Sequence, residues 1–332
     1  MEKTERLIKV GNVEGQKGTV QKGFFKVGSY SDGSSISIPV MIATGKTQEP
    51  VLWLQAAVHG EEYGGSASII QLVNSLNLEE LKGTVVAVPV ANLPSYRVKA
   101  RTSPLDGENL NRIFPGNPGG TYSQQLASAL VDEIARTADL FIDLHSGGIG
   151  AEVPTYAIYV DDKSKAAEES KHLCKAIGVE YIWKIKGEAG LMGAVVAHIV
   201  NKGIPSLTVE VGGGNVTQAH ISDYTISVTN VMKAAGMLDG DTPVLSRYSY
   251  ITDGNFLFCK EGGLFNPKCK VGSVLSKGDI IGQVTNLFGE VVEEIVNPAD
   301  NAYIAAIRLP FWPCDSGELV AESIVIESHE EQ

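Results

Sequence analysis

LQAAVHGEEYGG, residues 54–65, joins an apolar run to a histidine with two acids close behind it. The run has the composition of a strand covered on both faces, and His59, Glu61 and Glu62 come where it stops. Either this strand ends in an ordinary polar loop, or its end carries a metal site. A His-x-x-Glu spacing alone favours the loop, so the choice depends on what the rest of the chain places beside it.

Short, nearly continuous apolar runs recur along the chain, at 51–58, 84–90, 140–145 and 206–211. Segments with helical character lie between them, at 66–76, 123–138 and 163–178. This alternation predicts an α/β fold with a mostly parallel, doubly wound sheet. Residues 19–44 add a predicted pair of strands joined by the turn SYSDG.

Three of the apolar runs end in groups that bind metals. His59 follows the first run, His145 ends LFIDLH, and Glu210 lies near the end of SLTVEV. Because ligands bind at the carboxyl ends of the strands in such sheets, these residues are expected to lie together. Glu62 shares a face with His59 if both lie in the first turn of a helix, whereas Glu61 is expected to be solvated. His59, Glu62 and His145 then form a set typical of catalytic zinc, which predicts one Zn²⁺ per chain.

Glu210 is left outside this ligand set. We therefore predict that it is the general base that takes the proton from a water whose pKa zinc lowers to about 7. Asp143 lies two residues before His145 on the same face of the strand. It is predicted to accept the free ring N–H of a zinc-binding histidine, with His59 as the preferred partner, although a structural carboxylate bonded to backbone amides is an alternative.

The loop at 91–116 supplies positive charge close to the same edge. Arg112, beside Asn111, is predicted to hold a substrate carboxylate through paired hydrogen bonds. Arg101 is predicted to stabilise the oxyanion that forms when water adds to an amide carbonyl. Each arginine alone is compatible with an ordinary surface charge. Their shared loop favours a small-molecule substrate that carries a carboxylate.

The composition excludes several classes of partner. With 27 Lys and Arg against 39 Asp and Glu, the net charge is −12, which disfavours nucleic acid and anionic membranes. No apolar run reaches the roughly 18–20 residues of a membrane helix, and the N-terminus lacks the apolar centre of a secretory signal, so a cytoplasmic protein is expected. The 4 cysteines are scattered and are expected to be free thiols. A homo-oligomer is compatible with all of this.

The chain changes character after a segment at 221–240 that predicts a closing helix. From about residue 245 there are short strands with glycine or proline turns and no helical periodicity. We therefore predict a catalytic domain at 1–240 and a small all-β domain at 241–332.

Four motifs, in the order AAVHGEEYGG, GENLNRIFPG, IDLHSG and GIPSLTVEVGGG, resemble those of the succinylglutamate desuccinylase/aspartoacylase family. This family is the deacylase branch of the zinc carboxypeptidase superfamily, and the resemblance runs from about residue 20 to 325. It implies a zinc-carboxypeptidase-like, mixed and mostly parallel sheet with flanking helices. The second domain would be barrel-like and similar to biotinyl or lipoyl modules. A carrier role is rejected, because the corresponding turn, NLFGEVV, has no lysine.

Position by position, the resemblance implies zinc ligands at His59, Glu62 and His145 and a general base at Glu210. It implies a carboxylate clamp at Asn111 and Arg112, and Arg101 matches the oxyanion arginine.

The expected activity is zinc-dependent hydrolysis of the amide of an N-acyl amino acid or a similar small acylated amine with a carboxylate. Two alternatives stay open: a zinc carboxypeptidase that acts on short peptides, and a non-catalytic binding module with a vestigial site.

Overall fold

The chain folds around one large sheet with helices on both faces, and the computed structural model describes residues 6–186 and 193–332. Its earlier strands are β1 (Lys9–Val10), β2 (Val13–Glu14), β3 (Thr19–Ser29), β4 (Ser35–Thr44), β5 (Val51–Ala56), β6 (Thr84–Val88), β7 (Leu140–His145), β8 (Ala151–Asp161), β9 (Tyr181–Lys186) and β10 (Ser206–Gly213). The later strands are β11 (Arg247–Phe258), β12 (Gly263–Pro267), β13 (Val274–Leu275), β14 (Ile280–Thr285), β15 (Val291–Val296), β16 (Ala302–Arg308), β17 (Trp312–Cys314) and β18 (Leu319–Glu331). The helices are α1 (Gly64–Ser75), α2 (Leu93–Val98), α3 (Tyr122–Thr137), α4 (Lys165–Ala176), α5 (Val195–Asn201) and α6 (Gln218–Ala234), with the 3-10 helix η1 (Leu110–Arg112).

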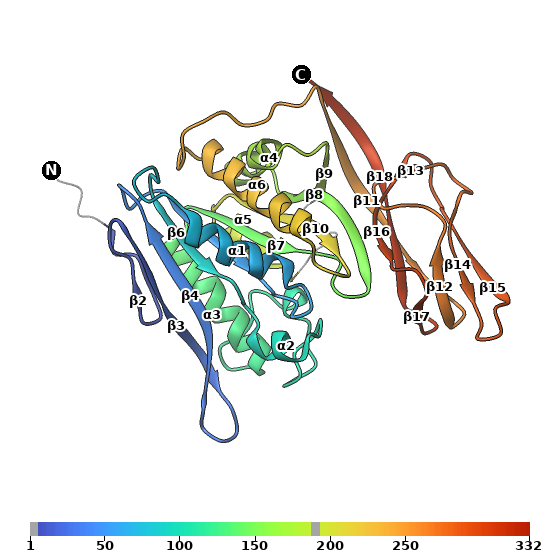
Figure 1. The fold of residues 1–332 in the computed structure, drawn as a ribbon, viewed down its shortest axis with the longest axis horizontal. Coiled ribbons are helices and arrows are strands. Elements are labelled where there is room, and N and C mark those ends of the chain that lie inside the picture. Colours follow the sequence, from blue (N-terminus) through green and yellow to red (C-terminus); the bar gives the residue numbers. More distant parts are fainter. Residues whose placement is uncertain (1–5, 187–192) are drawn as a thin grey trace.

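Within the described residues the large sheet runs β13-β16-β18-β11-β9-β8-β10-β7-β5-β6-β4-β3. Figure 1 shows its helix-covered part, from blue to yellow, beside the orange and red strands of the C-terminal part. The fold is mixed α/β, as expected. Parallel pairing is confined to two blocks, β6-β5-β7-β10 and β8-β9-β11, because β8 runs antiparallel to β10. The strand pair expected at 19–44 is the antiparallel pair β3 and β4.

The central strands are buried on both faces, which explains their continuous apolar sequence. Alternate residues of β5 serve two different cores. Trp53 packs with α3 and α5 on one face, and Leu52 and Leu54 pack with α1, α4 and α6 on the other. Burying each such side chain contributes about 1.5–3 kcal/mol, so the two cores hold the edge that carries the site in a fixed position.

The predicted helices are present with shifted ends. The closing helix α6 stops at Ala234 rather than at 240, and the chain turns at Gly236, whose φ is +71°. A residue with a side chain rarely adopts such a φ, so a glycine suits this turn. No helix of the described part of the chain is long and apolar enough to cross a membrane.

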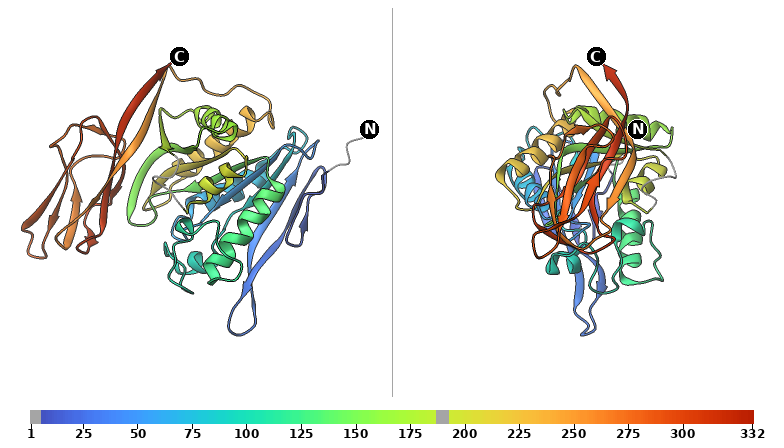
Figure 2. Two further views of the ribbon diagram at one scale, coloured as in Figure 1. Left: turned by 180° about the vertical axis from the view of Figure 1, so that it is seen from behind. Right: turned by 90° about the vertical axis from the view of Figure 1, so that its right-hand side faces the viewer.

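The barrel-like sheet expected within 241–332 is present, but that segment alone does not make it. β11 pairs with β9, and β16 pairs with β8, so that β8, β9, β11, β18 and β16 form a closed ring of strands. The remaining strands of the C-terminal part form a separate sheet in the order β15-β14-β12-β17. Figure 2 shows this part packed along one side of the helix-covered sheet. The ring joins the two parts of the chain at the site described next.

Candidate active site

A turn after β5 carries the first two predicted ligands. The sequence suggested that His59 and Glu62 share the first turn of a helix, but the structure does not place them there, because α1 begins only at Gly64. Instead, the Glu62 N–H donates to the carbonyl of His59 at 3.1 Å, and this turn brings both side chains to one side. The turn starts at Ala57, whose φ of +54° is a left-handed conformation that non-glycine residues seldom adopt.

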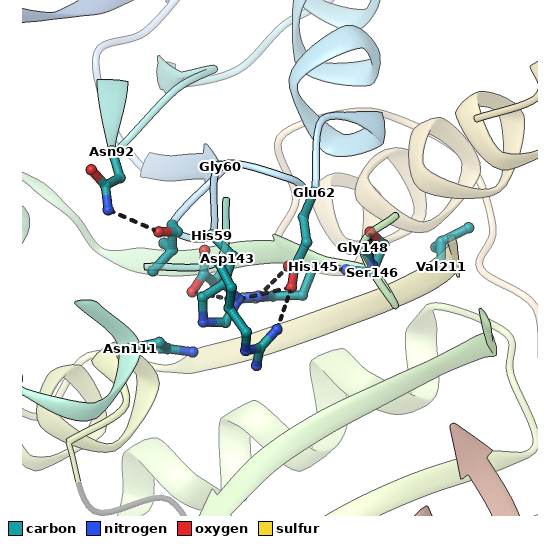
Figure 3. A network of polar contacts seen from close by, with 12 residues as sticks. His59, Gly60, Glu62, Asn92, Asn111, Asp143, His145, Ser146, Gly148 and Val211 are labelled. Carbon is teal, nitrogen blue, oxygen red and sulfur yellow. Dashed lines mark hydrogen bonds and ion pairs between the residues drawn. The ribbon is translucent and has the colours of Figure 1, made fainter. Parts of the chain in front are cut away.

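The loop that contains α2 holds this turn in place. The Gly60 N–H donates to the carbonyl of Ala100 at 2.9 Å, and a Cβ on Gly60 would lie 2.0 Å from the carbonyl carbon of Ser95. Only glycine allows the two backbones to approach this closely. The side-chain amide of Asn92 donates to the carbonyl of Val58 at 3.3 Å (Figure 3).

The ligand atoms of His59, Glu62 and His145 lie within 4.8 Å of one another, and all three residues are buried. Nδ1 of His59 is 2.8 Å from Oε1 of Glu62, and Nδ1 of His145 is 2.8 Å from Oε2. Figure 3 shows the Glu62 carboxylate reaching down to His145 beside His59. The fold therefore brings together two imidazole nitrogens and one carboxylate, from the turn after β5 and from the end of β7.

The second nitrogen of each ring also has a partner. Nε2 of His145 is 2.8 Å from Asp143, and Nε2 of His59 is 3.0 Å from the side-chain oxygen of Asn109. If each Nε2 carries the proton, both Nδ1 lone pairs are available to a cation, which is how such acceptors prepare metal-binding histidines. The cluster therefore fits a metal ion. The prediction that Asp143 serves His59 is wrong: alternate residues share one face of β7, so Asp143 contacts His145.

The electrostatics of the cluster follow from burial and close charges. Burial alone would raise the pKa of the Glu62 carboxyl, but His59 and His145 outweigh it and hold that pKa well below its ordinary value. Burial lowers the pKa of His59, and the Arg101 guanidinium adds to this effect. Burial would lower the pKa of His145 too, but Asp143 and Glu62 raise it well above its usual range. A cation that binds Nδ1 of His145 must therefore displace a proton.

Glu210 lies on β10, opposite His145 of β7 and opposite Tyr156 of β8. It lines the same pocket as the cluster but is not part of it. Burial raises the pKa of its carboxyl to about 8; His145 opposes this shift and the carboxylate of Glu62 adds to it. A cation at the cluster would lower this pKa, since a nearby positive charge favours the ionised carboxylate.

Both predicted arginines line the pocket. Arg101 donates to Oε1 of Glu62 at 3.0 Å, so it lies at the cluster. Arg112 donates to the backbone carbonyl of Asn111 at 2.8 Å. The side-chain oxygen of Asn111 accepts the N–H of Val195 at 3.1 Å, which leaves the amide nitrogen as the end available to a ligand. Burial lowers the pKa of Arg112, and Arg101 lowers it further.

Other polar residues differ from expectation or stay outside the site. Glu61, expected to be solvated, is half-buried in the pocket, and burial raises the pKa of its carboxyl. His220 caps α6 by accepting the N–H of Thr217 at 3.4 Å, so it serves the helix rather than the site. His172 is exposed on α4, and His198 is partly exposed on α5.

The pocket has a volume of about 470 Å³, which suits a small ligand. The metal end holds the His59–Glu62–His145 cluster, Glu210 and the two arginines. The ring end is formed by residues of the closed ring of strands, Tyr156, Ile158, Trp183, Phe256, Ala306 and Glu322. The two ends meet, because Tyr156 lies directly opposite Glu210 in the sheet, and Glu322 is close enough to Arg101 and Arg112 for their charges to counteract the burial that raises its pKa.

Several residues of the site were not predicted from the sequence. Asn109 lies in the quoted motif GENLNRIFPG, but only the fold reveals its contact with His59. Tyr224 of α6 donates its hydroxyl to the carbonyls of His145 and Val211, at 2.5 and 3.1 Å, and ties the ends of β7 and β10 together. A tyrosine in an amphipathic helix gives no sign of this contact.

Comparison with known proteins identifies the family of the chain. The model of the succinylglutamate desuccinylase/aspartoacylase catalytic domain matches residues 48–235, more than half of the chain. The chain belongs to the succinylglutamate desuccinylase/aspartoacylase family.

Among the similar proteins, one is named as a deacetylase and one as a succinylglutamate desuccinylase/aspartoacylase. The N-alpha-acetyl-L-2,4-diaminobutyric acid deacetylase of Halomonas elongata is 28% identical over 304 residues, which cover 88% of this chain and 87% of that protein. The product-bound ectoine utilization protein EutE (DoeB) of Ruegeria pomeroyi is 28% identical with a TM-score of 0.82, over 92% of this chain and 95% of that one. A succinylglutamate desuccinylase/aspartoacylase of Rhodobacter sphaeroides is 25% identical with a TM-score of 0.80, over 93% and 96%. These similarities support an amide hydrolase.

Proposed function

We propose that the protein is a zinc-dependent deacylase that hydrolyses the amide of a small N-acyl amino acid. The observation that carries this proposal is Glu210, a carboxylate that lines the pocket beside the His₂Glu cluster without belonging to it. A binding module has no evident need for such a group, whereas hydrolysis needs a base to take the proton of the attacking water.

When bound, zinc supplies Lewis-acid polarisation of the scissile carbonyl and makes a water more acidic. His59, Glu62 and His145 would hold it, and Asp143 and Asn109 would fix the two rings. Glu210 takes the proton as the water oxygen adds to the carbonyl carbon, and then delivers a proton to the nitrogen as the C–N bond breaks. The second proton of the water also passes to the amine, so the products are the protonated amine and the acyl group as a carboxylate.

The two arginines have different roles in the proposed reaction. Arg101, next to Glu62, donates hydrogen bonds to the oxyanion that forms on the carbonyl oxygen. Arg112 and the amide nitrogen of Asn111 bind the carboxylate of the amino acid and so align the amide with Glu210. The bounded volume of the pocket and its wall of ring strands favour a small acylated amine over a peptide.

The test is amine release from N-acetyl, N-succinyl and N-formyl amino acids and from short peptides, with zinc-loaded protein. We expect release from acylated amino acids, and loss of turnover by about 10²- to 10⁴-fold in Glu210→Gln with zinc content unchanged. Glu152→Gln serves as the control, because Glu152 is an exposed carboxylate of β8 and should leave the rate unaltered.

Release from peptides alone would instead indicate a carboxypeptidase. Retention of nearly normal rates by Glu210→Gln would remove Glu210 as the base. If the zinc-loaded protein releases no amine from any compound of the panel, the result would favour a non-catalytic binding module.

A further inference from the structure

Tyr156 lies where the metal end and the ring end of the pocket meet. It is directly opposite Glu210 on the antiparallel strands β8 and β10, so the two side chains lie on the same face of the sheet. Both residues line the pocket. A tyrosine side chain is longer than that of a glutamate, so the hydroxyl can extend further from the sheet than the Glu210 carboxylate. Neither the metal cluster nor the carboxylate clamp needs this hydroxyl.

The hydroxyl of Tyr156 has no hydrogen bond with the residues that the structure describes. The residue is only 2% exposed, and a buried tyrosine usually bonds its hydroxyl to a fixed partner. Tyr224, which is also buried, does so, because its hydroxyl donates to the carbonyls of His145 and Val211. The hydroxyl of Tyr156 is instead open to the pocket, and it is therefore available to a ligand.

The surroundings keep this hydroxyl protonated. Burial raises the pKa of the Tyr156 phenol well above its usual range, and the carboxylates of Glu210 and Glu322 add to the shift. The same carboxylates would repel an anionic group of the substrate at this place. A neutral phenol oxygen can both donate and accept a hydrogen bond. The position therefore suits a neutral polar group of the substrate rather than its carboxylate.

The scissile amide nitrogen is the neutral group that must come next to Glu210. After water adds, this nitrogen becomes tetrahedral, and its lone pair must point to the Glu210 carboxyl to receive a proton. The N–H that the nitrogen already carries then points away from Glu210 and needs an acceptor. Arg101, Arg112 and the side-chain nitrogen of Asn111 can only donate. Tyr156 places beside Glu210 an oxygen that can accept this N–H.

We propose that Tyr156 is a catalytic residue whose phenol oxygen accepts the N–H of the scissile amide and so turns the nitrogen lone pair toward Glu210. No bond to Tyr156 forms or breaks in this role. The contact holds the bound amide, and it matters most in the tetrahedral state, because the nitrogen must keep one orientation to receive the proton. This inference rests on the proposed deacylase function and adds to it a requirement for the N–H of the substrate.

A matched amide and ester test this contact. N-acetyl-L-alanine and O-acetyl-L-lactate differ only in the N–H of the amide, which is an oxygen in the ester, and any other amino acid has a hydroxy-acid counterpart of the same kind. In Tyr156→Phe, which keeps the ring, kcat/KM for the amide should fall by roughly 10- to 100-fold and that for the ester by less than about 3-fold. Zinc content should not change. Glu210→Gln should slow both substrates, because both need the base to activate water.

Tyr159→Phe is the control. Tyr159 lies on the same strand, but its spacing of three residues from Tyr156 turns its side chain to the opposite face of the sheet, outside this pocket. It is also buried, and loss of its hydroxyl should leave both rates unaltered. An equal loss on amide and ester in Tyr156→Phe, or no loss on either, would overturn the proposal. Melting temperatures of the variants show whether folding is preserved.

A binding measurement separates this inference from the proposed function. If the zinc-loaded protein hydrolyses neither an acylated amino acid nor its ester, the deacylase proposal fails by itself. Calorimetric titration with N-acetyl-L-alanine and O-acetyl-L-lactate still tests the contact. Tighter binding of the amide that is lost in Tyr156→Phe supports it. Equal binding of the two compounds, or binding of neither, refutes it.

Discussion

The two ends of the pocket are built in different ways. The metal end collects residues from the carboxyl ends of β5, β7 and β10, which are neighbouring parallel strands, and from the turns that follow them. The ring end collects side chains of strands that lie far apart in the sequence, such as Tyr156 and Phe256. The two ends meet where Tyr156 lies directly opposite Glu210 in the sheet. Four changes probe this division.

The largest effect is expected at the metal end. His145→Ala removes one ligand and leaves the carboxylates of Asp143 and Glu62 without their shared partner. We expect loss of bound zinc and a fall in turnover of roughly 10³-fold or more. Metal analysis by mass spectrometry checks this, with His172→Ala, an exposed histidine of α4, as the control. Full zinc occupancy in His145→Ala would remove it from the ligand set.

Arg112→Ala should separate binding from chemistry. Loss of the charge-assisted hydrogen bonds from Arg112 to the substrate carboxylate is expected to lower kcat/KM by about 10- to 100-fold, mostly through a higher KM, while zinc content stays normal. The loss should be much smaller for a substrate whose carboxylate is converted to an amide. Arg97→Ala is the control, because Arg97 is exposed and donates to the hydroxyl of Tyr30. Equal losses on both substrates would show that Arg112 does not contact the carboxylate.

Phe256→Leu probes the ring end. Removing this ring from the pocket lining should lower kcat/KM for N-acyl amino acids by roughly 3- to 10-fold, mostly through KM, and leave zinc content unchanged. Steady-state kinetics measure this change. Phe288→Leu, in the exposed turn between β14 and β15, is the control and should not alter kcat/KM. An unchanged kcat/KM in Phe256→Leu would show that this ring does not contact the substrate.

The smallest effect concerns stability of the metal-free protein. The folded state raises the pKa of Glu210 from its ordinary 4.5 to about 8, so unfolding in this range releases a proton. The free energy of unfolding therefore decreases as pH rises from about 5 to about 8. Glu210→Gln lacks this contribution, so its melting temperature should fall less than that of the wild type over the same range. Parallel pH profiles would contradict the raised pKa, and added zinc should weaken the difference.

The sequence predicted the metal end well because its signals are local. Continuous apolar runs identify buried parallel strands, and a polar residue at the end of each run must lie at the shared edge of the sheet. This reasoning led to His59, Glu62, His145 and Glu210, which the fold does bring together. It failed for the partner of Asp143, although the spacing of two residues already places Asp143 and His145 on one face of β7 and so favours His145 over His59.

By itself, the sequence determined the α/β class, the candidate ligands and the β-rich character of the C-terminal part, since hydrophobic periodicity and motif spacing carry this information. Tertiary structure alone decided that β8 and β9 close a ring with β11, β16 and β18. Pairing between distant strands depends on register and on the path of the chain, and no local pattern encodes it. The ring brings Tyr156, Trp183 and Phe256 into the lining of the pocket, so the residues of this end are a product of the fold rather than of any single motif.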